Sequence, residues 1–268
     1  MSDPDTLRSL VAPLVQGVRE TQDAASGLIV RSLRAADRDI EHRLHELACE
    51  TSARYVLGHL LTARPIRQRK HADGGRLELL EHALGLVMVD GFYAEFGVYK
   101  GDSLAFIANR IDSVIYGFDS FEGLPSDWFL DYGKGFFSLG GQAPRIETAQ
   151  QNFRLLKGWF EDSLPVFTAQ IDGPAAFLHI ACDLYESARA ALEGLASRIV
   201  PGTVIVLAEY LNYPGWERHE FRAFAEFCAA HGVRYRYAAF TPTAFAVTVV
   251  IEAVDPALGQ WGANGGHE

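Results

Sequence analysis

From residue 91 onward, short apolar runs alternate with segments of helical periodicity, and this alternation constrains the fold more than any other feature of the chain. Five β/α alternations are typical of a doubly wound sheet, whose parallel strands are joined by helices on both faces. The last two runs are separated only by Thr241, Pro242 and Thr243, which is too short for a parallel crossover. We therefore expect an α/β fold with a seven-stranded sheet containing one antiparallel strand. The expected strands are residues 92–96, 114–118, 154–157, 176–181, 204–208, 235–240 and 244–251.

The segment before this alternation is predicted to be helical. Leucines and other apolar residues recur at helical spacing, first at Leu7, Leu10, Leu14 and Val18 and then at Leu33, Ile40, Leu44 and Leu47. A further helix around residues 77–84 ends near Gly85, and the stretch 64–75, with its proline and glycines, breaks the pattern. We expect two regions: residues 1–75, a helical region that acts as a lid and in dimerisation, and residues 76–268, the ligand-binding domain.

A glycine turn follows the first expected strand. Glu95 lies at the end of that strand, and Gly97 and Gly101 frame a tight turn into the next helix. Glycine is needed where a backbone turns sharply or approaches a ligand closely, and in open α/β sheets ligands bind at the carboxyl ends of strands. Neither the dinucleotide fingerprint nor the phosphate-binding loop is present. A carboxylate at this place suits a cationic ligand better than a pyrophosphate.

A second acid ends the next expected strand. The separation of Asp119 from Glu95 along the chain is close to the roughly 20-residue offset at which an acidic residue binds ribose hydroxyls in nucleotide-binding α/β folds. A pattern of one acid and two glycines arises often by chance, but here a strand precedes it, a helix follows it and a second acid ends the next strand. The pair Glu95 and Asp119 indicates an adenosine-type ligand.

Composition excludes several other classes. The formal net charge is −10, from 34 acidic and 24 basic residues, and no extended basic block is present. Nucleic acid is therefore a poor partner. Three widely spaced cysteines make neither a disulfide framework nor a zinc site. The polar first residues have no apolar signal core, and no run is long and apolar enough for a membrane span. The expectation is a soluble, cytoplasmic protein with no membrane partner.

Four motifs in this order resemble the macrocin O-methyltransferase family of class I S-adenosylmethionine-dependent methyltransferases. They are EFGVYKG at 95–101, GFDSFEGLP at 117–125, GWFEDSLP at 158–165 and DLYES at 183–187. The resemblance spans about residues 69–250. It implies a Rossmann-like fold, the cofactor S-adenosylmethionine, and methylation of a hydroxyl of a small natural product, such as a sugar or phenol. We also expect a homodimer.

The resemblance implies that the glycine turn holds the cofactor, that Asp119 binds its ribose, and that residues 158–162 lie over the adenine. Trp159 or Phe160 would stack on the base and Asp162 would accept from its amino group, although ordinary core packing is an equal reading for the two aromatic residues. The candidate cofactor-binding residues are Glu95, Phe96, Gly97, Tyr99, Gly101, Ser103, Asp119, Ser120, Phe121, Trp159, Phe160, Asp162 and Asp183.

Many family members hold a magnesium ion on aspartates at two places. In this sequence one of them reads Ala181-Cys182-Asp183 and the other Ala208-Glu209. An alanine replaces an aspartate in each, which leaves Asp183 and Glu209 as the candidate metal ligands. Magnesium prefers hard oxygen ligands in near-octahedral geometry, so the substitutions leave open whether a metal is bound.

The candidate catalytic residues are Asp183, Glu209 and His219. Methyl transfer to a hydroxyl requires the acceptor to be aligned and its proton removed. The simpler readings are a helix cap for Asp183, a surface acid for Glu209 and a solvated helix residue for His219. His179, on an apolar strand, is interpreted as a core histidine. The hypothesis is that Asp183 is the base or metal ligand and that Glu209 assists.

Two other functions stay open at this point. One is a non-catalytic homologue that binds the cofactor but has lost the metal and base site, which Ala181 and Ala208 favour. The other is a nucleotide-dependent oxidoreductase of similar topology, against which the absence of a dinucleotide fingerprint argues. The aromatic loop 126–146 is the candidate determinant of acceptor specificity, and the sequence does not identify the acceptor.

Overall fold

The computed structural model describes residues 39–70 and 73–255 of the 268-residue chain. Two compact units divide between Glu46 and Leu47. The described part of the first unit, residues 39–46, is helical, and the helix continues to residue 59. The predicted helical segment at Leu7–Val18 and position Leu33 lie outside the described residues. The prediction of a helix through Ile40, Leu44 and Leu47 is confirmed.

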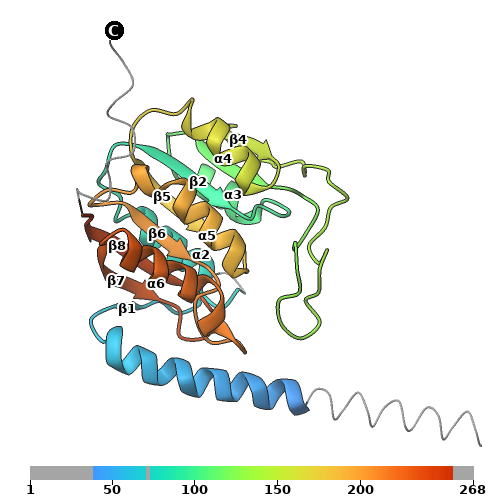
Figure 1. Cartoon of the computed structure of the whole chain (residues 1–268), viewed down its shortest axis with the longest axis vertical. Coiled ribbons are helices and arrows are strands. Elements are labelled where there is room, and N and C mark those ends of the chain that lie inside the picture. Colours follow the sequence, from blue (N-terminus) through green and yellow to red (C-terminus); the bar gives the residue numbers. More distant parts are fainter. Residues whose placement is uncertain (1–38, 71–72, 256–268) are drawn as a thin grey trace, which may run out of the picture. The chain divides into compact units, whose positions relative to one another are not determined.

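The second unit carries the α/β fold (Figure 1). Its elements are, in chain order, β1 (Arg64–Pro65), α2 (Arg76–Leu84), β2 (Phe92–Phe96), α3 (Asp102–Ala108), β3 (Ile115–Asp119), β4 (Phe153–Lys157), α4 (Phe160–Thr168), β5 (Ala175–Ile180), α5 (Tyr185–Gly194), the 3₁₀ turn η1 (Ala196–Arg198), β6 (Val204–Leu207), the 3₁₀ turn η2 (Trp216–Arg218), α6 (Glu220–Ala230), β7 (Arg234–Phe240) and β8 (Val247–Ala253).

The strands form one sheet in the order β1-β7-β8-β6-β5-β2-β3-β4. All neighbouring strands are parallel except the pairs that β8 makes with β6 and β7, so the prediction of one reversed strand is confirmed. The prediction of seven strands was one too few. Residues 64–65 pair in parallel with Ala239 and Phe240 at the edge, and a two-residue strand produces no detectable alternation in the sequence.

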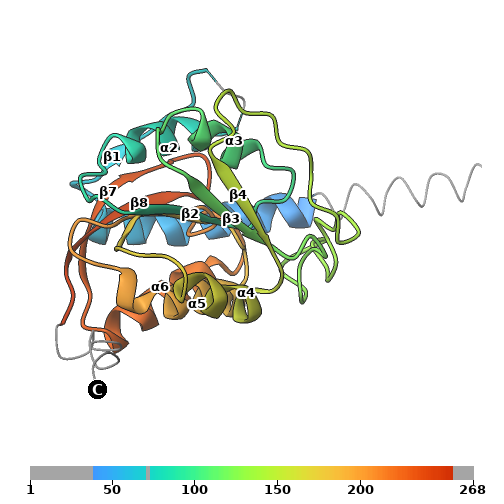
Figure 2. The same ribbon diagram turned by 90° about the horizontal axis from the view of Figure 1, so that it is seen from above.

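Helices cover both faces of the sheet, as Figure 2 shows: α2 and α3 lie on one face, and α4, α5 and α6 on the other. Successive side chains of a strand point to opposite faces. In β6, Val204 and Val206 therefore pack with the α2/α3 layer, and Ile205 and Leu207 pack with the other layer. All four are buried, which explains why this strand is an uninterrupted apolar run.

The end of the N-terminal helix belongs to the sheet-containing unit and contacts the loop after β6. The backbone N–H of Asn212 donates to Ser52 Oγ at 2.8 Å, and Trp216 Nε1 donates to Thr51 Oγ1 at 3.1 Å. Ser52 is fully buried. The expected roles of residues 1–75 as a lid and in dimerisation stay predictions. Within the described residues, no helix is long and apolar enough to cross a membrane.

Candidate functional site

A cavity of about 610 Å³ lies at the carboxyl edge of the sheet, within the size range of small-molecule sites. Its wall is formed by the loops after β2, β3, β4 and β5, by Glu209 after β6, and by one side of α2. These are the strand ends where open α/β sheets bind ligands. The lining residues are Asp73, Arg76, Leu77, Leu80, residues 97–103, Asp119, Ser120, residues 123–125, Phe137, residues 158–161, His179, residues 181–183, Glu186, Ser187 and Glu209.

The glycine turn brings the loop after β2 against the loop after β5. Gly97 has a φ of +90°, and a Cβ at this position would overlap the carbonyl oxygen of Ala181. A hydrogen bond also joins the loop after β5 to the end of β2, because Ala181 N–H donates to Phe96 O at 2.8 Å. Gly97 N–H donates to Phe118 O of β3 at 2.9 Å. Only glycine satisfies both the conformation and the close approach.

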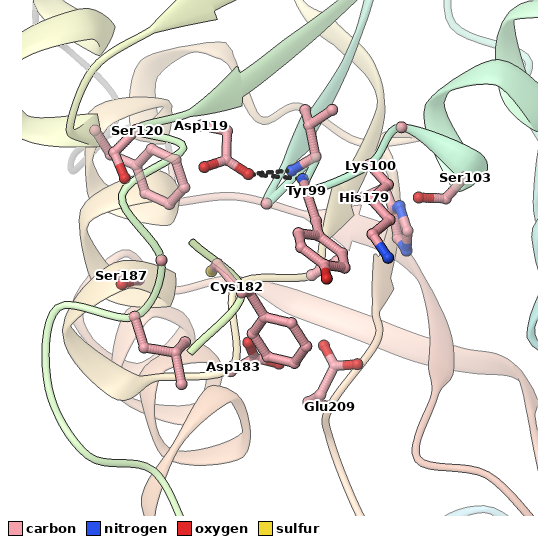
Figure 3. A pocket seen from close by; sticks show the side chains of 18 of the residues that line it. Tyr99, Lys100, Ser103, Asp119, Ser120, His179, Cys182, Asp183, Ser187 and Glu209 are labelled. Atoms are coloured by element: carbon pink, nitrogen blue, oxygen red, sulfur yellow. Dashed lines mark hydrogen bonds between the residues drawn. The ribbon is translucent and has the colours of Figure 1, made fainter. Parts of the chain in front are cut away.

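Asp119 holds two loops of the site through its carboxylate (Figure 3). Oδ2 accepts from the backbone N–H groups of Val98 and Tyr99 at 2.9 and 2.7 Å, and Oδ1 accepts from Phe121 N–H at 2.7 Å. Tyr99 and Phe121 have φ values of +50° and +60°, which are unfavourable for residues with a side chain. Charge-assisted hydrogen bonds are the stronger class, so Asp119 stabilises both of these backbone conformations.

Glu95 does not line the cavity and acts from behind its wall. It is fully buried, Oε1 accepts from Ser103 Oγ at 2.6 Å, and Oε2 lies 3.6 Å from Nδ1 of His179. Ser103 and His179 do line the cavity. His179 was interpreted from the sequence as a core histidine. It is 2% exposed, but it also lines the cavity and contacts the Glu95 carboxylate, which does not.

The structure places the remaining predicted cofactor residues in two groups. Tyr99, Gly101, Ser120, Trp159, Phe160 and Asp183 line the cavity. Phe96 and Phe121 are buried in the core and Asp162 is exposed in the first turn of α4, and these three do not line it. Phe96 stacks on Phe118 with 4.7 Å between ring centroids, and it makes a T-shaped ring contact with Phe160.

Asp183 and Glu209 lie at the end of the cavity away from Asp119 (Figure 3). Burial and the charge of Glu209 raise the pKa of Asp183 well above its ordinary value. Burial also raises the pKa of Glu209, against the opposing effect of Arg76, whose guanidinium Nη2 lies 3.2 Å from Glu209 Oε1. Glu209 is 4% exposed, and its Oε2 has no hydrogen-bond partner. The pair therefore offers carboxylate oxygens with raised proton affinity to the cavity.

A third carboxylate, Glu220 at the start of α6, supports these two from outside the cavity. Its oxygens accept from the backbone N–H groups of Cys182 at 3.3 Å and Glu209 at 2.9 Å, so it links the loops after β5 and β6. Burial and the charge of Glu209 raise its pKa well above the ordinary value. Glu220 and Arg76 were not among the residues predicted from the sequence, because both come from helices that reach the strand ends only through packing.

His219 does not line the cavity. It directly precedes α6, and burial lowers the pKa of its imidazole, an effect that the charge of Glu186 opposes. It therefore lies outside the cavity wall that contains Asp183 and Glu209, the two residues with which the sequence grouped it. Within residues 39–70 and 73–255, no group of three or more His, Cys, Asp or Glu side chains is arranged to hold a metal ion. Asp183 and Glu209 face the guanidinium of Arg76 instead.

Together, this sheet order and the cavity at its carboxyl edge define a Rossmann-like methyltransferase fold. The solved O-methyltransferase NovP superposes on 80% of this chain and 98% of its own, with 20% identity and a TM-score of 0.51. The calicheamicin methyltransferase CalS11 superposes on 65% of this chain and 77% of its own, also with 20% identity and a TM-score of 0.51.

Comparison of the sequence with known proteins identifies the family. Residues 73–238 match the macrocin-O-methyltransferase (TylF) family, and the chain belongs to this family. A relative from Streptomyces olivaceus, 8-demethyl-8-(2,3-dimethoxy-alpha-L-rhamnosyl)-tetracenomycin-C 4'-O-methyltransferase, is 30% identical over 159 residues. The match covers 50% of this chain and 60% of that relative's length.

Proposed function

We propose that the protein is an S-adenosylmethionine-dependent O-methyltransferase that methylates a hydroxyl of a small natural product, a sugar or a phenol. The observation that carries the proposal is the arrangement of the cavity, with the glycine turn and Asp119 at one end and the carboxylates Asp183 and Glu209 at the other. Family membership supports the reaction, and the rhamnosyl acceptor in the name of the Streptomyces olivaceus relative supports the acceptor class.

The residues of the glycine turn fit the cofactor. Gly97 leaves no room for a side chain between the two loops, and Asp119 retains acceptor capacity, since an ionised carboxylate has about four lone-pair sites and three are used by backbone N–H groups. We assign the ribose to Asp119 and the adenine face to Trp159 and Phe160. Asp162 is not assigned, because it does not line the cavity.

Methyl transfer to a hydroxyl also needs alignment of the acceptor and a base for its proton. S-adenosylmethionine, held at the glycine turn and Asp119, would supply a sulfonium methyl group for transfer to the acceptor oxygen. We assign proton acceptance to the Asp183 and Glu209 pair. Burial raises the pKa of both carboxyls, and a base whose pKa lies closer to the working pH transfers protons more efficiently.

Two measurements test this function. Calorimetric titration with S-adenosylhomocysteine measures cofactor binding, and transfer of a labelled methyl group to a panel of rhamnosides and phenols measures turnover. In Asp183→Asn and Glu209→Gln, we expect cofactor binding to change less than threefold and turnover to fall by about 10²–10⁴-fold, the usual contribution of a general base. Full turnover in both variants would refute the assignment. Cofactor binding without transfer to any acceptor would favour a non-catalytic binding protein.

A homodimer is part of the proposal. Leu47 and Leu57 on the N-terminal helix and Leu61 just after it are 43%, 66% and 73% exposed, which supports the helix as an association surface. Replacing Leu57 and Leu61 with glutamate is expected to halve the mass in light scattering. A wild-type monomer at micromolar concentration would contradict the proposal.

A further inference from the structure

The acceptor end of the cavity contains a cationic side chain among carboxylates. Arg76 opens α2 and lines the cavity. Its guanidinium lies 3.2 Å from Glu209 Oε1 and also faces the charges of Asp183, Glu220 and Asp73. Glu209 is almost fully buried. A buried carboxylate is strongly destabilising unless it is paired, and Arg76 is the cationic partner that the structure places beside Glu209.

The same carboxylates do not provide the ligand set of a divalent cation. Both oxygens of Glu220 already accept backbone N–H groups, and one oxygen of Glu209 faces the guanidinium. Ala181 and Cys182 precede Asp183 in the cavity wall, and neither the methyl group nor the thiol is a hard oxygen ligand. Magnesium needs hard oxygen ligands in near-octahedral geometry, and the described residues contain no cluster of three candidate ligands.

We infer that this site works without a divalent metal ion and that the Arg76 guanidinium supplies the positive charge at the acceptor hydroxyl. The inference rests on the proposed O-methyltransferase function. A guanidinium has five N–H donors in a rigid plane. One edge of Arg76 holds Glu209 as the base, and the donors that face the cavity bind the acceptor oxygen. As the proton passes to the carboxylate, the negative charge that develops on that oxygen is stabilised by Arg76.

The first experiment needs no acceptor. The full-length protein, loaded with S-adenosylhomocysteine, is titrated with MgCl₂ and MnCl₂ in a calorimeter. We expect no binding up to about 1 mM, the weak end of protein sites for hard divalent cations. The double variant Ala181→Asp with Arg76→Met removes the guanidinium and adds a third carboxylate beside Asp183 and Glu209. It is expected to gain Mn²⁺ binding, which the Mn²⁺ electron paramagnetic resonance signal reports independently.

The second experiment separates the role of Arg76 from general stability. Arg76→Met is compared with Arg110→Met, because Arg110 lies outside the cavity, 3.8 Å from Glu81 and over the ring of Phe106. We expect Arg76→Met to bind S-adenosylhomocysteine normally and to lose about 10²–10³-fold in kcat, as other oxyanion donors do. Arg110→Met should keep its kcat, and excess chelator should not change turnover of the wild type.

Three results would overturn the inference. They are Mg²⁺ or Mn²⁺ binding to the wild type below about 1 mM, turnover that chelator abolishes and Mg²⁺ restores, and an Arg76→Met variant with kcat within twofold of the wild type. In each case methyl transfer by the wild type still supports the proposed function. The failure of the inference is therefore distinguishable from the failure of the function.

Discussion

Asp119 offers a quantitative test of how the cofactor loops are held. Its carboxylate accepts three backbone N–H groups, from Val98, Tyr99 and Phe121. In Asp119→Asn the side-chain oxygen can retain the two bonds made by Oδ2, but the amide NH₂ then faces Phe121 N–H as one donor against another. The substitution thus removes one charge-assisted bond and converts two others into neutral bonds.

The magnitude follows from typical hydrogen-bond energies. A hydrogen bond to a charged group contributes about 1.5–3 kcal/mol and a neutral one about 0.5–1.5 kcal/mol. One lost charged bond and two bonds weakened by about 1 kcal/mol each together cost about 3.5–5 kcal/mol. Removing the charge of Asp119 relieves some of its repulsion with Asp183, which offsets a small part of this. We expect Asp119→Asn to lower the free energy of unfolding by about 3–4 kcal/mol.

Urea unfolding followed by circular dichroism measures this change, provided that the slope of the transition stays constant. Asp127→Asn is the matched control, since Asp127 Oδ1 accepts from Lys134 N–H in an exposed loop, at 2.8 Å, and surface changes of this kind cost about 0.5 kcal/mol. Calorimetry with S-adenosylhomocysteine on the folded variant should show weaker binding. A loss of stability below about 1 kcal/mol would show that the three bonds do not hold the loops.

Three further outcomes are expected. Gly97→Ala should abolish cofactor binding in calorimetry, because its Cβ would overlap the carbonyl oxygen of Ala181; binding within threefold of the wild type would contradict this. Because the raised pKa of Glu220 makes the folded state bind more protons than the unfolded state, the free energy of unfolding should fall as pH rises from 4.5 through that pKa. Glu220→Gln should flatten this dependence in urea titrations, and an unchanged slope would be evidence against it. Asn152→Ala should lower the free energy of unfolding by about 2 kcal/mol, since Asn152 Nδ2 lies within 3.1 Å of the carbonyl oxygens of Ala108, Ile111 and Ser113; a change below a quarter of this would refute the role.

The parts of the fold that depend on local sequence pattern could be predicted. The strands, the reversed pair and the turn at Gly97 follow from apolar periodicity, a short connection and glycine spacing, and the structure confirms them. The two-residue strand β1 was missed because its pairing with β7 is made by backbone groups. No pattern in such a short segment reports it.

The site was predictable to a smaller extent. Residues at strand ends or shortly after them, such as Gly97, Asp119, Asp183 and Glu209, were placed at the cavity because strand ends share one edge of the sheet. Whether a strand-end side chain faces the cavity or the core is decided by packing, and for this reason Glu95 lies behind Ser103 and His179. The position of Arg76 depends on how α2 crosses the strand ends, which the helical periodicity of α2 does not encode.

The contacts between the N-terminal helix and the loop after β6 bear on how the chain can be divided. Ser52 and Thr51 bind Asn212 and Trp216, and the same loop contains Glu209. The family match begins at residue 73, so a fragment cut at that boundary keeps every residue of the cavity wall and loses the partners of this loop. The boundary of the family match therefore encloses the residues that line the cavity. A fragment that is to be expressed alone or fused to another protein must start further upstream, so that it includes Thr51 and Ser52.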